Sequence, residues 1–377
     1  DEAFAQWRRA HGKRYADQSA ELERRAVFRE NQQLAEELTR AEGGVEYSSA
    51  GPWADLTAAE FRARVLMPPR GPPPALDAAR ERAPAAAGPL PASFDWSARG
   101  VVTAVRDQQA LGSCWAFSAT ENIEGQYARA TGKLLQLSPE QLVECDAGFD
   151  QTCGGRGPTH GDFECADCGM FGGWPYLAYQ YLQKVGGIFT EADWPYFHEG
   201  IFPCMPEGYS KKGCGNHDDL YCRRNSTKGQ GPGGLCQARS GAVARVTGWK
   251  ALSLNETELA AQLVQYGPLS VLIDASHLQL YRSGVWGGGP FGCRPDPGRG
   301  VLGLDHAVLL VGYGVERGVL GRESPYWKLK NSWGPRWGEA GYFRMTRGAG
   351  TCGVNLAATT AEVAAATVAR APVDLVI

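Results

Sequence analysis

The sequence predicts an α+β protein, and three stretches of its 377 residues support that prediction. Residues 1 to about 66 place apolar side chains at helical spacing among Glu and Arg, as an amphipathic helical unit does. A long helix is expected from Cys114 to about Gly132. Short β-like runs, such as P-L-S-V-L-I and A-V-L-L-V-G-Y-G, occupy the stretch from Val243 to about Met345. The apolar stripe of the first stretch comprises Phe4, Trp7, Tyr15, Leu22, Val27, Phe28 and Leu34.

Length, composition and charge bound the class of protein. A chain of 377 residues that is 43% hydrophobic has room for two or three domains with a large core. Its formal net charge of −3 gives no reason to expect a nucleic acid or an anionic membrane as partner. No apolar run approaches the ~20 residues of a membrane span. The chain starts at Asp1 without a methionine or signal peptide, so we expect that a targeting segment has been trimmed from it.

The cysteines indicate the compartment. There are 11 of them, an odd number, and two sequons at Asn225 and Asn255 predict glycosylation on the secretory route. Cysteines pair in that oxidising environment, so one unpaired nucleophile and ten bridged cysteines would account for the count. We therefore expect a lysosomal, vacuolar or extracellular protein. The alternative is a reduced cytosolic protein with free thiols.

Cys114 is the candidate nucleophile. It follows Ser113, a good N-cap, at the expected start of a helix, where the positive end of the helix dipole favours a thiolate. Gln108 lies six residues earlier and can donate a side-chain N–H to a developing oxyanion, beside the backbone N–H of Cys114. The alternative interpretation of Cys114 is a buried and inert thiol.

A reactive cysteine needs a base and a group that orients the base. His306 opens the β-like run H-A-V-L-L-V-G-Y-G, and Asn331 follows the alternating run Y-W-K-L-K. Together the segments Q-x5-C-W-A-F-S, D-H-A-V-L-L-V-G-Y-G and K-N-S-W-G-P-R-W-G-E-A-G-Y-F resemble the papain family of cysteine peptidases, in the right order. A lone histidine is usually structural, but the three matching segments favour a catalytic role for His306.

The resemblance implies a role for each of these residues. Cys114 would be the nucleophile and His306 its general base, then the general acid for the leaving amine. Asn331 would orient the imidazole, Gln108 would complete the oxyanion hole, and Trp333 would shield the His306–Asn331 hydrogen bond from water. A thioester would form and then be hydrolysed, and no metal or cofactor is needed. The expected partners are protein and peptide substrates and the chain's own propeptide, and we expect a monomer.

The same resemblance divides the chain into three parts. Residues 1–67 would be an inhibitory propeptide domain, 68–91 a Pro/Ala-rich linker where activation cleavage occurs, and 92–377 the peptidase domain. The peptidase would have a helical left half and a β-barrel-like right half, with the active site in the cleft between them. The propeptide would run along the cleft in the reverse direction to a substrate, and acid would loosen it by protonating paired Asp and Glu.

The propeptide assignment rests on partial matches. In the family motif E-x3-R-x3-F-x2-N-x3-I-x3-N, this chain keeps Arg24, Phe28 and Asn31 but has different residues at three positions, Ala20, Ala35 and Thr39. The segment W-A-D-L-T-A-A-E-F from Trp53 is similar to the family segment that follows. A generic helical interaction domain is the alternative.

The resemblance also implies a substrate site. Gly172 and Gly173 resemble the segment whose backbone pairs with an extended substrate, and glycine is expected where another backbone approaches closely. An apolar pocket would favour Leu, Val or Phe two residues before the cut. The residues expected to line the pocket are Pro175, Leu272, Ala307 and Ala357, and Asp305 and Trp333 complete the substrate-binding set.

Two Cys-rich insertions, near 147–168 and 197–234, break the family spacing and are expected to be disulfide-stapled surface loops. The second contains His217 and Asp218, a pair that is either part of a second catalytic or metal site, a cap on one end of the cleft, or plain surface decoration.

The resemblance implies two disulfides, Cys145–Cys236 and Cys293–Cys352. The family bridge beside the nucleophile is missing, because Leu111 and Met170 occupy its two positions. We expect these two side chains to pack against each other in its place. Six cysteines remain, which allow 15 connectivities: Cys153, Cys165, Cys168, Cys204, Cys214 and Cys222.

An endopeptidase zymogen is thus the leading hypothesis, and two alternatives stay open. One is an exopeptidase whose Cys-rich loop blocks the cleft, with His198 or His217 binding a substrate carboxylate. The other is a catalytically inactive binding or inhibitory protein, which the complete set of four catalytic candidates disfavours.

Overall fold

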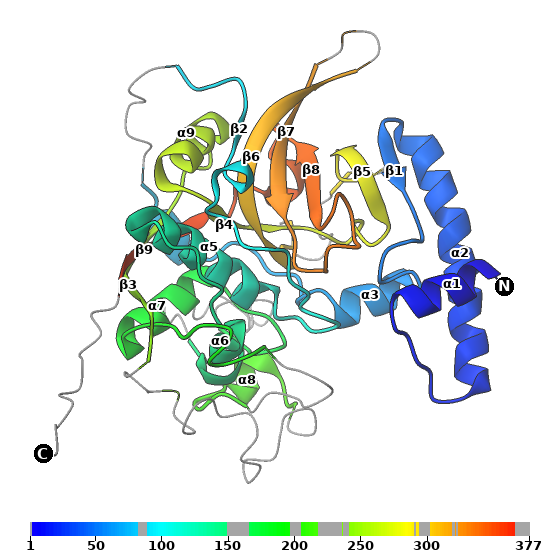
Figure 1. Cartoon of the computed structure of the whole chain (residues 1–377), viewed down its shortest axis with the longest axis horizontal. Helices are drawn as coiled ribbons and strands as arrows, with labels where there is room; N and C mark the ends of the chain where they lie inside the picture. Colours follow the sequence, from blue (N-terminus) through cyan, green and yellow to red (C-terminus); the bar gives the residue numbers. More distant parts are fainter. Residues whose placement is uncertain are drawn as a thin grey trace, which may run out of the picture.

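The computed structural model describes residues 2–81, 89–148, 166–196, 205–217, 236, 241–289, 292–293, 302–318, 321 and 323–365. Figure 1 shows a helical N-terminal unit on one side, a twisted sheet in the middle, and a group of helices below and beside the sheet. The fold is α+β, as the sequence predicts. In the described part of the chain, no helix is long and apolar enough to cross a membrane.

The N-terminal unit contains three helices, α1 (Glu2–Ala10), α2 (Gln18–Glu42) and α3 (Ala58–Arg64), and packs a small aromatic core between α1 and α2. Phe4, Trp7 and Phe28 are buried against one another. Leu22 and Leu34 are 47% and 39% exposed, so the expected apolar stripe is too wide. These two leucines lie on the outer face of α2, whose buried residues are Val27, Phe28, Asn31 and Ala35.

The sheet spans the N-terminal unit and the rest of the chain. Its order among the described residues is β1-β5-β8-β7-β6-β4-β9-β3, with β2 paired to β6, and the path is open rather than a closed ring. Strand β1 of the N-terminal unit joins the edge of the sheet by antiparallel pairing with β5. The strands are β1 (Val45–Tyr47), β2 (Phe94–Asp95), β3 (Ala244–Ala251), β4 (Leu269–Ile273), β5 (Tyr281–Trp286), β6 (His306–Arg317), β7 (Glu323–Lys330), β8 (Tyr342–Thr346) and β9 (Thr359–Ala365).

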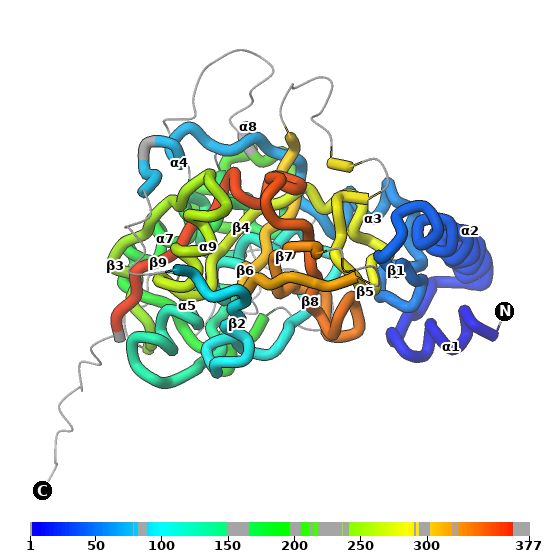
Figure 2. Tube along the Cα trace, turned by 90° about the horizontal axis from the view of Figure 1, so that it is seen from above, coloured from blue at the N-terminus to red at the C-terminus, as the bar shows by residue number. Residues whose placement is uncertain are grey.

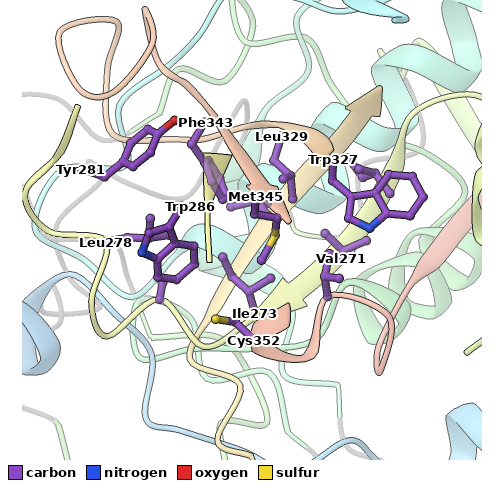
Figure 3. Packing of buried hydrophobic residues seen from close by; sticks show 14 of the residues in the cluster. Val271, Ile273, Leu278, Tyr281, Trp286, Trp327, Leu329, Phe343, Met345 and Cys352 are labelled. Carbon is purple, nitrogen blue, oxygen red and sulfur yellow. The ribbon is translucent and has the colours of Figure 1, made fainter. Parts of the chain in front are cut away.

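Alternation along the strands builds the core beside this sheet. Trp327 and Leu329 on β7 are fully buried, as are Phe343 and Met345 on β8, because every second side chain points to the same face. Figure 3 shows these residues packed with side chains of β4 and β5. This core fixes the strands that carry His306 and Asn331.

Helix α5 (Cys114–Thr131) is central and buried on nearly every side. It lies against β6 and β9, with α6 (Pro139–Cys145) and α7 (Pro175–Val185) around it. It ends at Gly132, whose φ of 74° suits glycine and closes the helix with a left-handed C-cap. The expected bounds of this helix are therefore confirmed. The remaining helices are α4 (Pro74–Ala78), α8 (Lys211–Cys214), α9 (Glu256–Tyr266) and the 3₁₀ turns Ser97–Arg99 and Thr351–Gly353.

The described part of the expected linker, residues 68–81 and 89–91, packs against the rest of the protein. A free linker would make no such core contacts. Leu76 in α4 is fully buried, and the Arg80 guanidinium donates to the carbonyl oxygens of Leu252 and Leu356. Figure 2 shows the chain crossing the molecule from α3 to α4. Leu76 and Arg80 make these contacts within a Pro/Ala-rich run, and composition alone does not predict them.

The structure contains both disulfides that the resemblance implies, Cys145–Cys236 and Cys293–Cys352. A third bridge, Cys168–Cys214, ties the two insertions together. Among the described cysteines, Cys114 is free. The other four cysteines of the insertions lie outside the described residues.

Candidate active site

Cys114 is the first residue of α5 and is fully buried. Ser113 occupies the N-cap position but does not cap the helix with its side chain, which corrects the sequence-based expectation. Its hydroxyl instead hydrogen-bonds the Tyr196 hydroxyl at 2.7 Å, and Tyr196 also donates to the Gln108 carbonyl oxygen. Tyr196 thereby connects the nucleophile's turn to Gln108, a role that no sequence signal indicated. The backbone N–H of Ala307 donates to Sγ of Cys114 across the cleft, at 3.4 Å.

His306 and Asn331 are brought together from neighbouring strands. His306 begins β6, Asn331 follows β7, and Nε2 of the imidazole lies 2.7 Å from Oδ1 of the amide. Oδ1 also accepts from the backbone N–H of Ser332, which fixes the amide orientation, so Nε2 carries the imidazole proton. Nδ1 is therefore the nitrogen left to act as base. The Trp333 ring stacks on the imidazole with centroids 4.6 Å apart.

Gln108 is oriented by a residue that the sequence analysis did not assign. Ser332 Oγ donates to Oε1 of Gln108 at 2.6 Å, so the amide Nε2 faces the opposite way. Nε2 donates to the carbonyl oxygens of Val65 and Leu111, at 3.0 and 2.7 Å. Ser332 lies in the recognised N-S-W-G segment, but Gln108 is 224 residues away, and only the fold brings the two together.

Burial sets the protonation of the catalytic candidates. Desolvation raises the pKa of Cys114 to about 12 and lowers the pKa of His306 to about 4. Among the described residues, Nδ1 of His306 has no hydrogen-bond partner. Both shifts favour the uncharged forms of the thiol and the imidazole.

A segment of the N-terminal unit fills the cleft. The Val65 carbonyl faces the Gln108 amide, and the backbone N–H of Met67 donates to the Asp305 carbonyl oxygen at 2.8 Å. Further along, the backbones of Arg70 and Leu304 pair, with N–H···O distances of 2.9 and 2.8 Å. Phe61 of α3 packs edge-on against Trp333 with ring centroids 5.3 Å apart. The N-terminal unit thus covers the candidate catalytic residues.

The expected substrate-binding residues surround this segment. Gly173 donates its backbone N–H to Sδ of Met67, and a Cβ on Gly172 would lie 3.1 Å from Cβ of Met67. Met67 is 1% exposed and shares one buried apolar cluster with three of the expected pocket residues, Leu272, Ala307 and Ala357. Pro175, the fourth, is the buried first residue of α7. Asp305 contributes its backbone carbonyl, and Trp333 contributes the surface on which Phe61 packs.

Other sequence-based expectations have mixed outcomes. The N–H of Gly112 donates to the Met170 carbonyl oxygen, and Leu111 packs against the cluster that contains Met170; their direct contact stays a prediction.

His217 stacks on Phe171 with ring centroids 3.7 Å apart. Within the described ranges, no group of three or more acidic, His or Cys side chains is placed to hold a metal. Asn255 is exposed, whereas Asn225, His198 and Asp218 lie outside the described residues.

Comparison with known proteins defines the class. Residues 90–362 match the papain family of cysteine proteases, and residues 4–61 match the cathepsin propeptide inhibitor domain. Because the family match covers well over half of the sequence, the chain belongs to the papain family of cysteine proteases and carries a cathepsin-type propeptide.

Two relatives and one solved structure illustrate this membership. Cysteine proteinase 15A of Pisum sativum is 35% identical over 364 residues, which cover 96% of this chain and 86% of the relative. Cathepsin F of Drosophila melanogaster is 34% identical over 369 residues, 97% of this chain but 50% of that protein, so the chain spans about half of its length. The structure of digestive procathepsin L 3 from Tenebrio molitor superposes with a TM-score of 0.69 at 30% identity, covering 96% of this chain and 98% of the other.

Proposed function

We propose that this chain is the latent form of an endopeptidase that cuts peptide bonds through Cys114 and His306. The observation that carries the proposal is the segment from Val65 to Arg70, which occupies the cleft with a carbonyl oxygen 3.0 Å from Nε2 of Gln108. That oxygen lies where an oxyanion donor would meet the carbonyl of a scissile bond. The propeptide would therefore hold the substrate position until it is removed.

In the released enzyme, Nδ1 of His306 would take the proton of Cys114, and the thiolate would attack the scissile carbonyl carbon. The negative oxygen that forms would be stabilised by Nε2–H of Gln108 and by the backbone N–H of Cys114. His306 would then give the proton to the leaving amine, which leaves a thioester, and water would hydrolyse the thioester with His306 again as base. Asn331 would hold the imidazole by accepting from Nε2–H, at the 2.7 Å distance seen here.

Specificity for an apolar residue two before the cut follows from the occupant of the pocket. The buried Met67 side chain packs with Leu272, Ala307 and Ala357, and none of these carries a charge. A substrate Leu, Val or Phe would bury similar apolar area at this place, about 1.5–3 kcal/mol for a full side chain.

An endopeptidase is favoured over an exopeptidase because a continuous chain passes through the cleft. Backbone or side-chain contacts run from Val65, at Gln108, to Arg80 and to Glu81, whose N–H donates to the Ala251 carbonyl oxygen. No chain terminus is needed to fill these positions. The exopeptidase stays a second candidate, and no observation favours it.

The proposed division is an inhibitory domain over residues 1–67, a segment over 68–91 that is cut during activation, and a peptidase over 92–377. We also infer a monomer on the secretory route, in a lysosome or vacuole or outside the cell. The disulfides and the cathepsin relatives support that route.

The test compares end-blocked with free-ended peptides as substrates of the activated protein. Cleavage of an end-blocked peptide within the chain supports the endopeptidase, and cleavage only next to a free end supports the exopeptidase. Labelling by a thiol-reactive peptide electrophile, with mapping of the labelled residue to Cys114, separates both from an inactive homologue, which would not be labelled.

A further inference from the structure

Arg70 is a cation buried completely inside the cleft. It lies on the segment from α3 to α4, three residues after Met67, and its exposed fraction is 0%. A buried guanidinium is costly unless carbonyl or carboxylate groups replace its water. The surroundings of Arg70 are therefore informative about what this part of the cleft accepts.

The guanidinium is received by backbone carbonyl groups of one tight turn. Nη1 donates to the Ala166 carbonyl oxygen at 3.0 Å, and Nη2 lies 3.5 Å from that of Phe171. The turn is closed by Phe171 N–H to Cys168 O and by Cys168 N–H to Gly172 O, and the Cys168–Cys214 bridge holds it from outside. Both acceptor carbonyls belong to the peptidase part of the chain, so they remain after the propeptide has left.

Glycine at position 172 is needed for the guanidinium to reach these carbonyls. A Cβ there would lie 2.6 Å from Nη2 of Arg70, and the φ of 111° is one that only glycine adopts easily. Space for the guanidinium is thus created by the absence of a side chain.

A pair of carboxyl groups lies behind the same turn. The fully buried carboxyl groups of Asp146 and Asp167 both lie beside Gly148, and burial raises the pKa of both. Two carboxyl groups this close favour a state in which one of them holds a proton. The pKa of Asp167 is raised the more strongly, an effect that the charge of Arg70 offsets only in part, and its Oδ1 accepts from the Trp174 backbone N–H at 2.6 Å, beside Gly173.

We propose that the cleft contains an arginine subsite, formed by Ala166, Asp167, Phe171 and Gly172, which binds the guanidinium of a substrate arginine in the mature enzyme. The inference rests on the proposed peptidase function and names a second specificity of the same cleft. In the latent chain Arg70 fills this subsite.

The geometry assigns the substrate position. The propeptide segment runs from Val65 at Gln108, through Met67 at Gly173, to Arg70 at Gly172. Arg70 therefore lies beyond the apolar pocket as seen from the catalytic residues. A substrate arginine would occupy the subsite from the third position before the cut, next to the apolar residue at the second.

The first test uses activated protein and end-blocked peptides with Leu at the second position before the cut. The third position is Arg, citrulline, Lys or Leu. Citrulline has the shape of arginine without its charge, so we expect kcat/KM for Arg to exceed that for citrulline about tenfold or more. Lys should fall between them, because an ammonium cannot reach both carbonyl groups as a fork does. Equal values for Arg and citrulline overturn the subsite.

A variant tests the carboxyl group of Asp167. Asp167→Asn keeps an oxygen acceptor for the Trp174 N–H but removes the carboxyl group that interacts electrostatically with Arg70, so the Arg-to-citrulline ratio should fall severalfold. Asp193→Asn removes an exposed carboxylate and is the matched control, with the ratio unchanged. A ratio that falls equally in both variants, or in neither, contradicts the role of Asp167.

A third measurement does not depend on catalysis. In the full-length chain, Arg70→Gln should raise the rate at which iodoacetamide alkylates Cys114 about tenfold, because the covering segment loses its buried anchor. Arg14→Gln, at an exposed position of the N-terminal unit, is the control. If no peptide is cleaved and the peptide electrophile does not label Cys114, the proposed peptidase function fails. The alkylation comparison still decides the subsite, and an unchanged rate in Arg70→Gln refutes it.

Discussion

Burial in the covered cleft favours the neutral forms of Cys114 and His306. Desolvation raises the pKa of the thiol to about 12 and lowers that of the imidazole to about 4. Because a thiolate is the reactive form of a cysteine, covering the cleft would lower the reactivity of the proposed nucleophile as well as exclude substrates. Rehydration of the cleft on activation would move both pKa values back toward their usual ranges.

Substitution of the proposed catalytic residues should abolish activity in a graded way. Cys114→Ala should lower kcat of the activated protein by on the order of 10⁴–10⁶, and His306→Ala by nearly as much. Asn331→Ala should cost less, because it removes only the orientation of the base. The measurement is kcat/KM on an end-blocked peptide, with circular dichroism to show that each variant is folded. Substantial activity in Cys114→Ala would remove the assignment of the nucleophile.

Ser332 is predicted to act through Gln108. Its hydroxyl donates to Oε1 of Gln108 at 2.6 Å, so Ser332→Ala should free the amide and lower kcat about tenfold with little change in KM. Gln108→Ala should lower kcat about 100-fold or more, and the double variant should be no worse than Gln108→Ala alone. Additive losses in the double variant would show that Ser332 acts independently.

At the scale of helices, strands and disulfides, some features could be predicted from the sequence and others could not. The bounds of α5 were predictable because a catalytic motif marks its start and Gly132 its end. The Cys145–Cys236 and Cys293–Cys352 bridges followed from spacing within a resemblance. The Cys168–Cys214 bridge did not, since both cysteines lie in insertions whose path the sequence does not specify. For the same reason the composition of the 68–91 stretch did not predict the docking of α4, in which Leu76 is buried in an apolar cluster formed largely by residues distant in the sequence.

The ion pair between α2 and α3 leads to a prediction about the stability of the N-terminal unit in acid. Arg24 donates to both carboxylate oxygens of Glu60, at 2.9 and 2.8 Å, and this lowers the pKa of Glu60 from 4.5 to about 2. A carboxyl group with a depressed pKa adds stability that is complete above its unfolded pKa and is lost as pH falls toward the folded value. The pair should therefore persist at pH 5 and disappear only between about pH 4.5 and 2.

Thermal unfolding of the Cys114→Ala chain, which cannot digest itself, measures this effect. Glu60→Gln in that background should lower the melting temperature at pH 5–7, and the difference should vanish near pH 2. Glu37→Gln, at an exposed position of α2, should show no such difference. A Glu60→Gln effect that is the same at every pH would mean that the pair's charge is not its source. Because the Arg24–Glu60 pair is expected to persist at pH 5, any loosening of the propeptide in mild acid must come from other groups.

Across the whole molecule, the covering segment is held at several separate places. Val65, Met67 and Arg70 contact the cleft, and Leu76 is fully buried further along the segment. Full-length protein should therefore be at least about 100-fold less active at neutral pH than a form that starts near Leu90, as expected when several contacts must break together. Equal activity of the two forms would contradict latency.

Leu76→Ala should weaken latency without touching the catalytic residues. Removing a fully buried leucine costs about 2–5 kcal/mol, so the full-length variant should show raised basal activity and faster conversion. Leu22→Ala, which truncates a leucine that is 47% exposed, is the matched control and should behave as the wild type. Initial rates on an end-blocked peptide, before any conversion is visible on a gel, provide the measurement.

The pairing of β1 with β5 has a consequence for the fate of the mature protein. In the precursor, residues 45–47 lie along β5 and pair with its backbone. If the propeptide is removed on activation, as proposed, that row of N–H and C=O groups would lose its partner and β5 would become the edge strand of the sheet. An unpaired edge strand is a template for pairing with an extended segment of another chain, including one from a neighbouring molecule. The proposed activation cut would therefore give each mature molecule an unpaired edge strand, open to pairing with another chain, that its precursor keeps covered.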